Sequence, residues 1–249
     1  MFKKLNITES LDSPERTLHH REILLKKKFM RELYVEWYKY FEDSLKVIPE
    51  GKILEIGSGG GFLKDVLPQV ITSDIIPLPT NDLTMSALEM PFSENELAAI
   101  FMIDTFHHLP DAEIFLKEVD RVLKRSGKVI MIEPANSLWG RFIYKNFHHE
   151  PFDPSGSWTF PSSGPLSGAN GALPWIVFKR DRERFLKEFP RLRIVSMTYH
   201  TPLLYLISGG FTMPQLLPDF VYPFIRWVDG RLGCIQPLGM FTTIEIEKV

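Results

Sequence analysis

Residues 52–63 read KILEIGSGGGFL, and these twelve residues are the clearest indication of the fold. Its apolar side chains Ile53, Leu54 and Ile56 predict a short buried strand that ends in four glycines within five positions. Apolar residues then return at close to a helical period, starting at Phe62. A strand, a glycine turn and a helix form the first unit of a doubly wound α/β fold, in which ligands bind beyond the carboxyl ends of the strands. Glycine suits this turn because a ligand can contact the backbone closely only where no Cβ intervenes.

The spacing of the glycines narrows the kind of ligand. The dinucleotide pattern G-x-G-x-x-G needs its third glycine at a position that holds Phe62 or Lys64 in this chain. The phosphate-binding P-loop is excluded as well, because no Gly-Lys-Ser or Gly-Lys-Thr follows. What fits is E-x-G-x-G-x-G, formed by Glu55, Gly57, Gly59 and Gly61. This pattern resembles motif I of the class I S-adenosylmethionine-dependent methyltransferases.

An acid follows at the end of the next predicted strand, residues 70–74. Asp74 lies 17 residues after Gly57, close to the ~20 residues that place a carboxylate beside a nucleotide ribose in this kind of fold. Such a carboxylate accepts hydrogen bonds from both ribose hydroxyls, whereas the plain alternative is a solvated turn aspartate. We predict that Asp74, with Ile75 beside it, contacts the cofactor.

Two later segments resemble the same family. Residues 86–92, SALEMPF, resemble its D-A-x-x-L-P-F segment, and an H-H-L turn follows a predicted strand at 98–103. The family has Asp where this chain has Ser86, so a hydroxyl replaces the carboxylate that commonly contacts the adenine amino group. The resemblance also implies cofactor contacts for Ser58, Ala87 and Asp104.

Residues 113–134 predict an amphipathic helix, a turn and a fifth strand. They resemble the family's E-x-x-R-V-L-K-P-G-G segment, with Arg125 and Ser126 in place of Pro and Gly. Agreement with the family is nearly continuous over residues 52–134, about a third of the chain.

The resemblance implies one α/β domain over residues 1–249. Its Rossmann-like doubly wound sheet has about seven strands, with the last antiparallel to its neighbours. We expect an N-terminal helical arm at 1–50, a cofactor-binding core at 51–134, and substrate or lid inserts at 135–176 and 201–238.

Composition bounds the partners and the compartment. The net charge of −2 argues against a partner held mainly by phosphate electrostatics, so we expect no nucleic acid. Cys234 is the only cysteine and cannot form an intrachain disulfide, which suits a reducing compartment. No apolar run approaches the ~18 residues of a membrane span. We expect a cytoplasmic protein, with a basic stretch at 19–28 that fits either a solvated helix face or peripheral contact with a membrane.

The sequence indicates the residues that bind the methyl acceptor less clearly than those that bind the cofactor. His108 falls on the turn after the fourth strand and is the predicted general base, with a packing histidine as the alternative. The aromatic insert at 135–176 offers Tyr144, His148 and Trp158 as predicted substrate contacts. Three His pairs, at 19–20, 107–108 and 148–149, raise the question of a metal. We expect none, because adjacent histidines on one backbone should point apart and no ligand spacing is recognisable.

The predicted function is methyl transfer from S-adenosylmethionine to a small molecule with an apolar part. Two alternatives stay open: an NAD-dependent Rossmann oxidoreductase, and a non-catalytic cofactor-binding protein of the same fold. The sequence leaves open the acceptor, the atom that is methylated and the oligomeric state.

Overall fold

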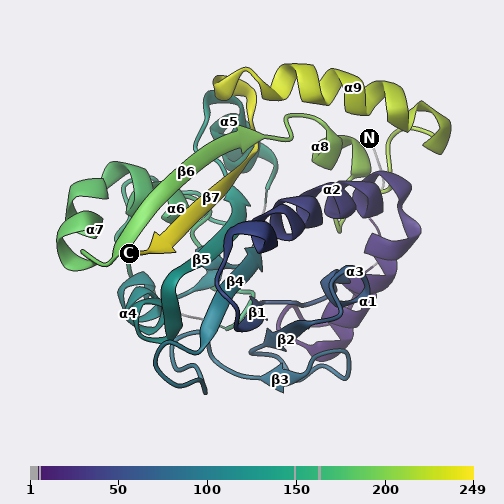
Figure 1. Ribbon diagram of the computed structural model, residues 1–249. Helices are drawn as coiled ribbons and strands as arrows, with labels where there is room; N and C mark the ends of the chain where they lie inside the picture. Colours follow the sequence, from purple (N-terminus) through teal and green to yellow (C-terminus); the bar gives the residue numbers. More distant parts are fainter. Residues whose placement is uncertain (1–4, 6, 149, 162–163) are drawn as a thin grey trace.

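We describe the fold from a computed structural model, which places residues 5, 7–148, 150–161 and 164–249. A seven-stranded sheet has the order β3-β2-β1-β4-β5-β7-β6 (Figure 1). Strand β7 is antiparallel to β5 and β6, and the other neighbouring strands are parallel. The seven-stranded sheet and its antiparallel last strand are both confirmed. The strands are β1 Lys52–Ile56, β2 Val70–Asp74, β3 Leu83–Thr84, β4 Leu97–Ile103, β5 Leu123–Pro134, β6 Leu192–His200 and β7 Phe241–Lys248.

Helices surround this sheet. They are α1 Pro14–Lys26, α2 Lys28–Ser44, α3 Leu63–Val66, α4 Ala112–Val122, α5 Leu138–Phe147, α6 Leu173–Trp175, α7 Arg182–Glu188, α8 Leu204–Ser208 and α9 Tyr222–Gly233. A 3-10 turn, Phe106–His108, follows β4. The helix predicted after the glycine loop is only one turn long, since Pro68 disfavours helical backbone at Leu67.

The N-terminal arm is part of the core. Ser13 caps α1 by accepting a hydrogen bond from the Arg16 amide, as its position before Pro14 predicts. Helix α2 then buries a stripe of large side chains four residues apart, Phe29, Leu33, Trp37 and Phe41. The Phe41 ring stacks on Phe101 of β4 with centroids 4.5 Å apart. Because each such burial contributes about 1.5–3 kcal/mol, the arm stabilises the domain as well as covering it.

The two inserts are more regular than their composition indicates. The first, the aromatic insert at 135–176, contains α5 and α6. The second contains α8, which packs against α2, and α9 on the outside of the molecule (Figure 1). Helix α9 and the turn before it leave Phe220, Phe224 and Trp227 exposed at 81%, 64% and 58%. Within the described residues, every helix is too short or too polar to cross a bilayer.

Candidate functional site

A cavity of about 340 Å³ lies at the carboxyl ends of β1, β2 and β4. This is the edge where doubly wound sheets bind ligands, and the volume lies within the range of small-molecule sites. The glycine loop lines one part of the cavity, the loop end, and the turn after β4 lines the part next to it, since Gly57 lies beside Thr105 of that turn. The predicted cofactor contacts that line this cavity are Glu55, Gly57, Ser58, Gly59, Gly61, Asp74, Ile75, Ser86, Ala87 and Asp104.

The glycine loop is shaped by backbone needs and by a close neighbour. Gly57 and Gly59 have φ of +70° and +46°, a region that side chains with a Cβ rarely adopt. Gly60 has a different constraint, because a Cβ there would lie 2.7 Å from the Arg21 amide nitrogen of α1. The Arg21 guanidinium also donates a hydrogen bond to the Gly61 carbonyl oxygen. Helix α1 therefore lies directly on the loop.

Asp74 holds the loop in place. One carboxylate oxygen accepts a hydrogen bond from the Gly59 amide and the other from the Ile76 amide, each at 2.9 Å. Burial raises the pKa of Asp74 above its usual value, although these amides act in the opposite direction. Asp82 lies four residues before Ser86 and is the other residue that could take the place of the family's aspartate. Its carboxylate accepts a hydrogen bond from the Thr72 amide and pairs with Lys64, and it does not line this cavity. Ser86 does line the cavity.

The arm contributes cavity residues that motif reading missed. Thr17 and His20 of α1 and Tyr34 and Tyr38 of α2 line the loop end. In the sequence these four residues belong only to the helical pattern of the arm, because the family motifs start at residue 52. Glu55 lines the same part of the cavity. Burial raises the pKa of Glu55 to about 7, although the hydrogen bond from Ser58 acts to lower it.

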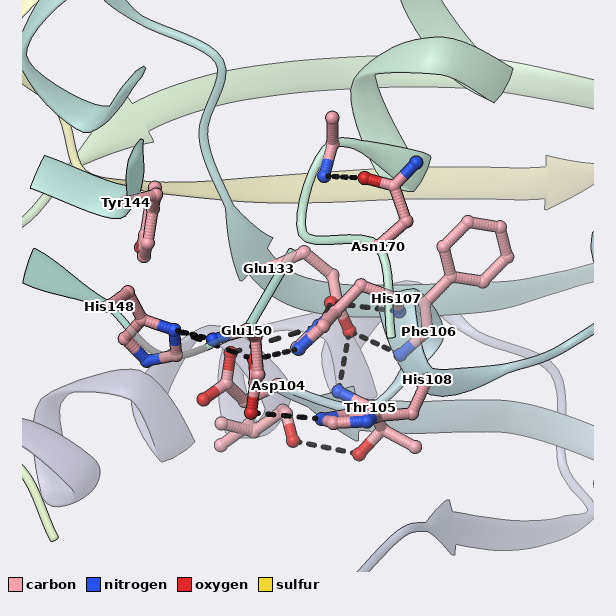
Figure 2. Close-up of polar contacts among 12 residues, drawn as sticks. Asp104, Thr105, Phe106, His107, His108, Glu133, Tyr144, His148, Glu150 and Asn170 are labelled. Carbon is pink, nitrogen blue, oxygen red and sulfur yellow. Dashed lines mark hydrogen bonds and ion pairs between the residues drawn. The ribbon is translucent and has the colours of Figure 1, made fainter. Parts of the chain in front are cut away.

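The other end of the cavity is organised by a buried carboxylate, Glu133 of β5. It has no exposed surface and accepts hydrogen bonds from the Thr105 and Phe106 amides at 2.9 and 2.7 Å. Its second oxygen lies 2.7 Å from Nδ1 of His107 (Figure 2). Glu133 therefore fixes the turn that carries both histidines. Sequence reasoning treated this acid only as the end of a strand.

His107 lies between two carboxylates. Its Nε2 is 3.3 Å from Oε2 of Glu150, on the side away from Glu133. Burial alone would lower its pKa, but the hydrogen bonds to Glu133 and Glu150 hold the pKa of His107 well above its usual value. The pKa of Glu150 is held low, because the charges and hydrogen bond of the surrounding histidines outweigh the effect of burial. Glu150 was missed from the sequence, although it directly follows the His pair at 148–149.

His108, the predicted base, does line the cavity. Its Nδ1 is 3.0 Å from the Gly168 carbonyl oxygen, which can only accept, so Nδ1 carries the hydrogen. Burial and the positive charge of His107 lower the pKa of His108 to about 4. The ring is therefore neutral, and its Nε2 lone pair lies 3.7 Å from Oε1 of Glu150.

Asp104 stands between the main cavity and a second, smaller one. Its backbone has φ of +54°, which is uncommon for a residue with a side chain. Burial raises the pKa of Asp104 to about 7, while His107 acts to lower it. Of the predicted substrate contacts, Tyr144 and His148 line the smaller cavity behind Asp104 and Glu150. The Tyr144 hydroxyl donates to the Met240 carbonyl oxygen at 2.8 Å.

Trp158 is the exception among the predicted contacts, because it lines neither of these two cavities. Its ring is buried, its indole N–H donates to Asp181 and the Arg184 guanidinium lies over it at 4.1 Å. The expectation that it contacts substrate is therefore corrected to a packing role against α7. His149 lies outside the described residues.

Residues 54–131 match the profile of a protein family described as "Methyltransferase domain". These residues therefore carry a methyltransferase domain, and the sheet order is that of the class I methyltransferase fold. S-adenosylmethionine is the methyl donor of this family.

The demethylmenaquinone methyltransferase of Symbiobacterium thermophilum is 30% identical over 105 residues, which are 42% of this chain and 41% of the relative. Residues aligned with this relative therefore span less than half of its length.

Two solved methyltransferase structures are similar to this chain. Geranyl diphosphate C-methyltransferase from Streptomyces coelicolor, in complex with Mg2+, geranyl diphosphate and S-adenosyl-L-homocysteine, has a TM-score of 0.50 at 13% identity, covering 100% of this chain and 92% of that one. At this identity the likeness establishes the fold alone. A methyltransferase from Archaeoglobus fulgidus has a TM-score of 0.49 at 15% identity, covering 86% of this chain and 94% of that one.

Proposed function

We propose that the protein transfers a methyl group from S-adenosylmethionine to a heteroatom of a small molecule with an apolar part. One observation carries this proposal. A single cavity is lined by the glycine loop and Asp74 and also by Asp104, His108 and Glu150. A donor and an acceptor bound there would meet in one cavity, as an in-line displacement requires.

The loop end fits the donor. Asp74 keeps oxygen lone pairs beyond the two amide hydrogen bonds and lies where ribose hydroxyls bind in doubly wound folds. Ser86 and Ala87 lie on the wall assigned to adenine, and Glu55 lies beside the loop as the negative charge for an amino or sulfonium group. The roles of Asp74 and Ala87 follow the family motifs, whereas Ser86 stands where the family has Asp.

The opposite end fits an acceptor with both apolar and polar parts. Leu109 supplies apolar surface there, and Asp104, His108 and Glu150 supply polar atoms. In the reaction, the acceptor heteroatom forms a bond to the methyl carbon while the carbon–sulfur bond of the donor breaks. The sulfonium becomes a neutral thioether, and the proton of the acceptor must leave to a nearby base or to water.

The outer face of α9 fits a membrane surface. Its exposed Phe224 and Trp227 lie beside Arg231, and its single acid, Asp229, is buried, whereas Arg226 pairs with Glu36 of α2. Aromatic residues with arginines are typical of helices that lie in the interface of anionic bilayers. By contrast, the basic stretch at 19–28 uses its side chains internally. His20 stacks on Phe211, Arg21 binds Gly61, and Lys27 donates to Gly210. We therefore place peripheral membrane contact at α9, which suits an apolar acceptor.

Calorimetry tests the donor assignment. S-adenosylmethionine and S-adenosylhomocysteine should bind, and NAD should not. Binding of NAD in their place would establish the oxidoreductase alternative. Transfer of a labelled methyl group should then be measured with phenols, amines and thiols that carry apolar groups. Donor binding without turnover on any of them would favour the non-catalytic alternative.

Vesicle sedimentation tests the membrane contact separately. Binding to vesicles that contain phosphatidylglycerol should fall in a Phe224→Ser, Trp227→Ser variant, and binding of S-adenosylhomocysteine should stay unchanged. Equal sedimentation of parent and variant would remove α9 from this role.

A further inference from the structure

We propose that His107, His108 and Glu150 bind a divalent transition-metal ion at the acceptor end of the cavity. The two imidazole Nε2 atoms face the same carboxylate, at 3.3 Å for His107 and 3.7 Å for His108. Each of the three residues offers one ligand atom, and these atoms lie within 4.8 Å of one another. Metal bonds of ~2.0–2.2 Å place two ligand atoms at most ~4.4 Å apart, so small side-chain rotations would complete the site.

We expected no metal from the sequence because adjacent histidines should point apart, and the backbone removes that reason. Adjacent histidines point apart in an extended chain, but His107 and His108 lie in a 3-10 turn. Their ring centroids are only 4.2 Å apart, with planes inclined by 42°. The hydrogen bonds from Thr105 and Phe106 to Glu133 stabilise this turn. The two histidines therefore converge because Glu133 of β5 holds the turn that carries them, through hydrogen bonds from the backbone of that turn.

The partners of both Nδ1 atoms are those of metal-bound histidines. His107 Nδ1 faces the Glu133 carboxylate at 2.7 Å, and His108 Nδ1 faces the Gly168 carbonyl oxygen at 3.0 Å. Both oxygens accept hydrogen bonds, so each partner favours a hydrogen on Nδ1 and directs Nε2 toward Glu150 (Figure 2). Histidine ligands in metalloproteins nearly always donate their other N–H to a carboxylate or a backbone carbonyl in this way.

A simpler explanation accounts for only half of the cluster. A protonated His107 between Glu133 and Glu150 would form a buried ion pair without any metal. That explanation leaves unexplained why His108, on the next residue, also directs Nε2 at Glu150. One cation between the three side chains would satisfy both Nε2 atoms and the carboxylate together.

The ligand chemistry selects the metal. Two imidazoles and one carboxylate suit Zn2+, Fe2+, Co2+ or Ni2+, whereas Mg2+ and Ca2+ prefer oxygen ligands. His108 and Glu150 line the main cavity, so the remaining coordination positions would face the acceptor. A metal there would bind an acceptor oxygen and lower its pKa, which replaces the general-base role predicted for His108. This consequence rests on the proposed function; the metal binding itself does not.

The test uses chelator-treated full-length protein titrated with Co2+, followed by its d–d absorption, and with Zn2+ by calorimetry. We expect one equivalent of each metal to bind. His108→Ala and Glu150→Gln should each weaken binding at least 10-fold, and Glu133→Gln should weaken it about 10- to 100-fold through His107. The matched control is Glu9→Gln, His19→Gln, which removes a histidine–carboxylate contact of 3.3 Å in the arm. This control should bind like the parent.

Two measurements keep the result interpretable. Unchanged affinity for S-adenosylhomocysteine in each variant shows that the donor end is still folded. Co2+ or Zn2+ binding that is equally tight in the parent and in the folded His108 and Glu150 variants would overturn the proposal, as would no stoichiometric binding by the parent. Methyl transfer that continues at the same rate after chelation would remove the catalytic role of the metal while leaving the proposed function intact.

Discussion

Replacing Gly60 by alanine should loosen α1 and weaken donor binding. The new Cβ would lie 2.7 Å from the Arg21 amide nitrogen, 3.0 Å from its Cα and 3.1 Å from the Thr17 carbonyl oxygen. All three atoms belong to the backbone of α1, so side-chain rotation cannot relieve the contact. Either α1 or the glycine loop must move.

The size of the effect follows from ordinary overpacking, which costs about 1–3 kcal/mol. If this cost falls on the conformation that binds the donor, with α1 against the glycine loop, the affinity for the donor drops by about 5- to 150-fold. Calorimetry with S-adenosylhomocysteine measures this loss. Limited proteolysis measures the second effect, faster cleavage within residues 14–26 than in the parent.

Gly230→Ala in α9 is the matched control. Apart from its chain neighbours and the backbone of its own helix, no heavy atom of the described residues lies within 4 Å of a Cβ placed there, so donor affinity should not change. Stability should rise slightly, since alanine favours helix by up to about 1 kcal/mol over glycine. Parent-like affinity and proteolysis in Gly60→Ala would refute the close approach of α1 to the loop.

Three further predictions concern the donor end and the arm. Asp74→Ala should weaken donor binding about 10- to 150-fold, from the ~1.5–3 kcal/mol of hydrogen bonds to a charged acceptor, and calorimetry against Asp74→Asn shows how much the charge contributes. Glu55 in the folded, donor-free protein has a pKa near 7, above the ordinary 4.5, so its contribution to stability declines as pH rises from about 4.5 to 7. The positively charged donor favours the charged form of Glu55, so donor affinity should rise with pH through 7 and binding should release a proton. Calorimetry in buffers of different ionisation enthalpy measures this proton release. The same pH dependence in a Glu55→Gln protein would contradict the prediction. Trp37→Ala should destabilise the domain by about 3–5 kcal/mol in urea unfolding, because the ring is buried 4.8 Å from Phe241 and its N–H faces Thr201, whereas exposed Tyr40→Ala should change stability by less than about 1 kcal/mol.

The sheet and the loop end could be predicted because their signals are local. The strand at 70–74 has the predicted bounds, and α4 begins within one residue of the predicted start at 113. Asp74 lines the cavity from the end of that strand, and Ser86, placed by the resemblance to the family segment, lines it as well.

The acceptor end could not be predicted because it is assembled from distant segments. Glu133, His107 and Glu150 lie on a strand, a turn and an insert, and no short motif connects them. The constraint on Gly60 depends likewise on α1, which lies about forty residues earlier in the chain. Trp158 was misassigned because aromatic content alone does not distinguish a pocket wall from a packing surface.

The position of α1 also affects how the protein completes a catalytic cycle. Thr17 and His20 form part of the cavity wall, so α1 covers the place where the donor would bind. The Arg21 hydrogen bond to Gly61, the His20 stack on Phe211 and the Lys27 contact with Gly210 can break without exposing the stripe that α2 buries, whereas lifting α1 would also expose its own buried Ile23 and Leu24. If α1 must lift before the spent donor can leave, this opening sets an upper limit on turnover through the rate of product departure.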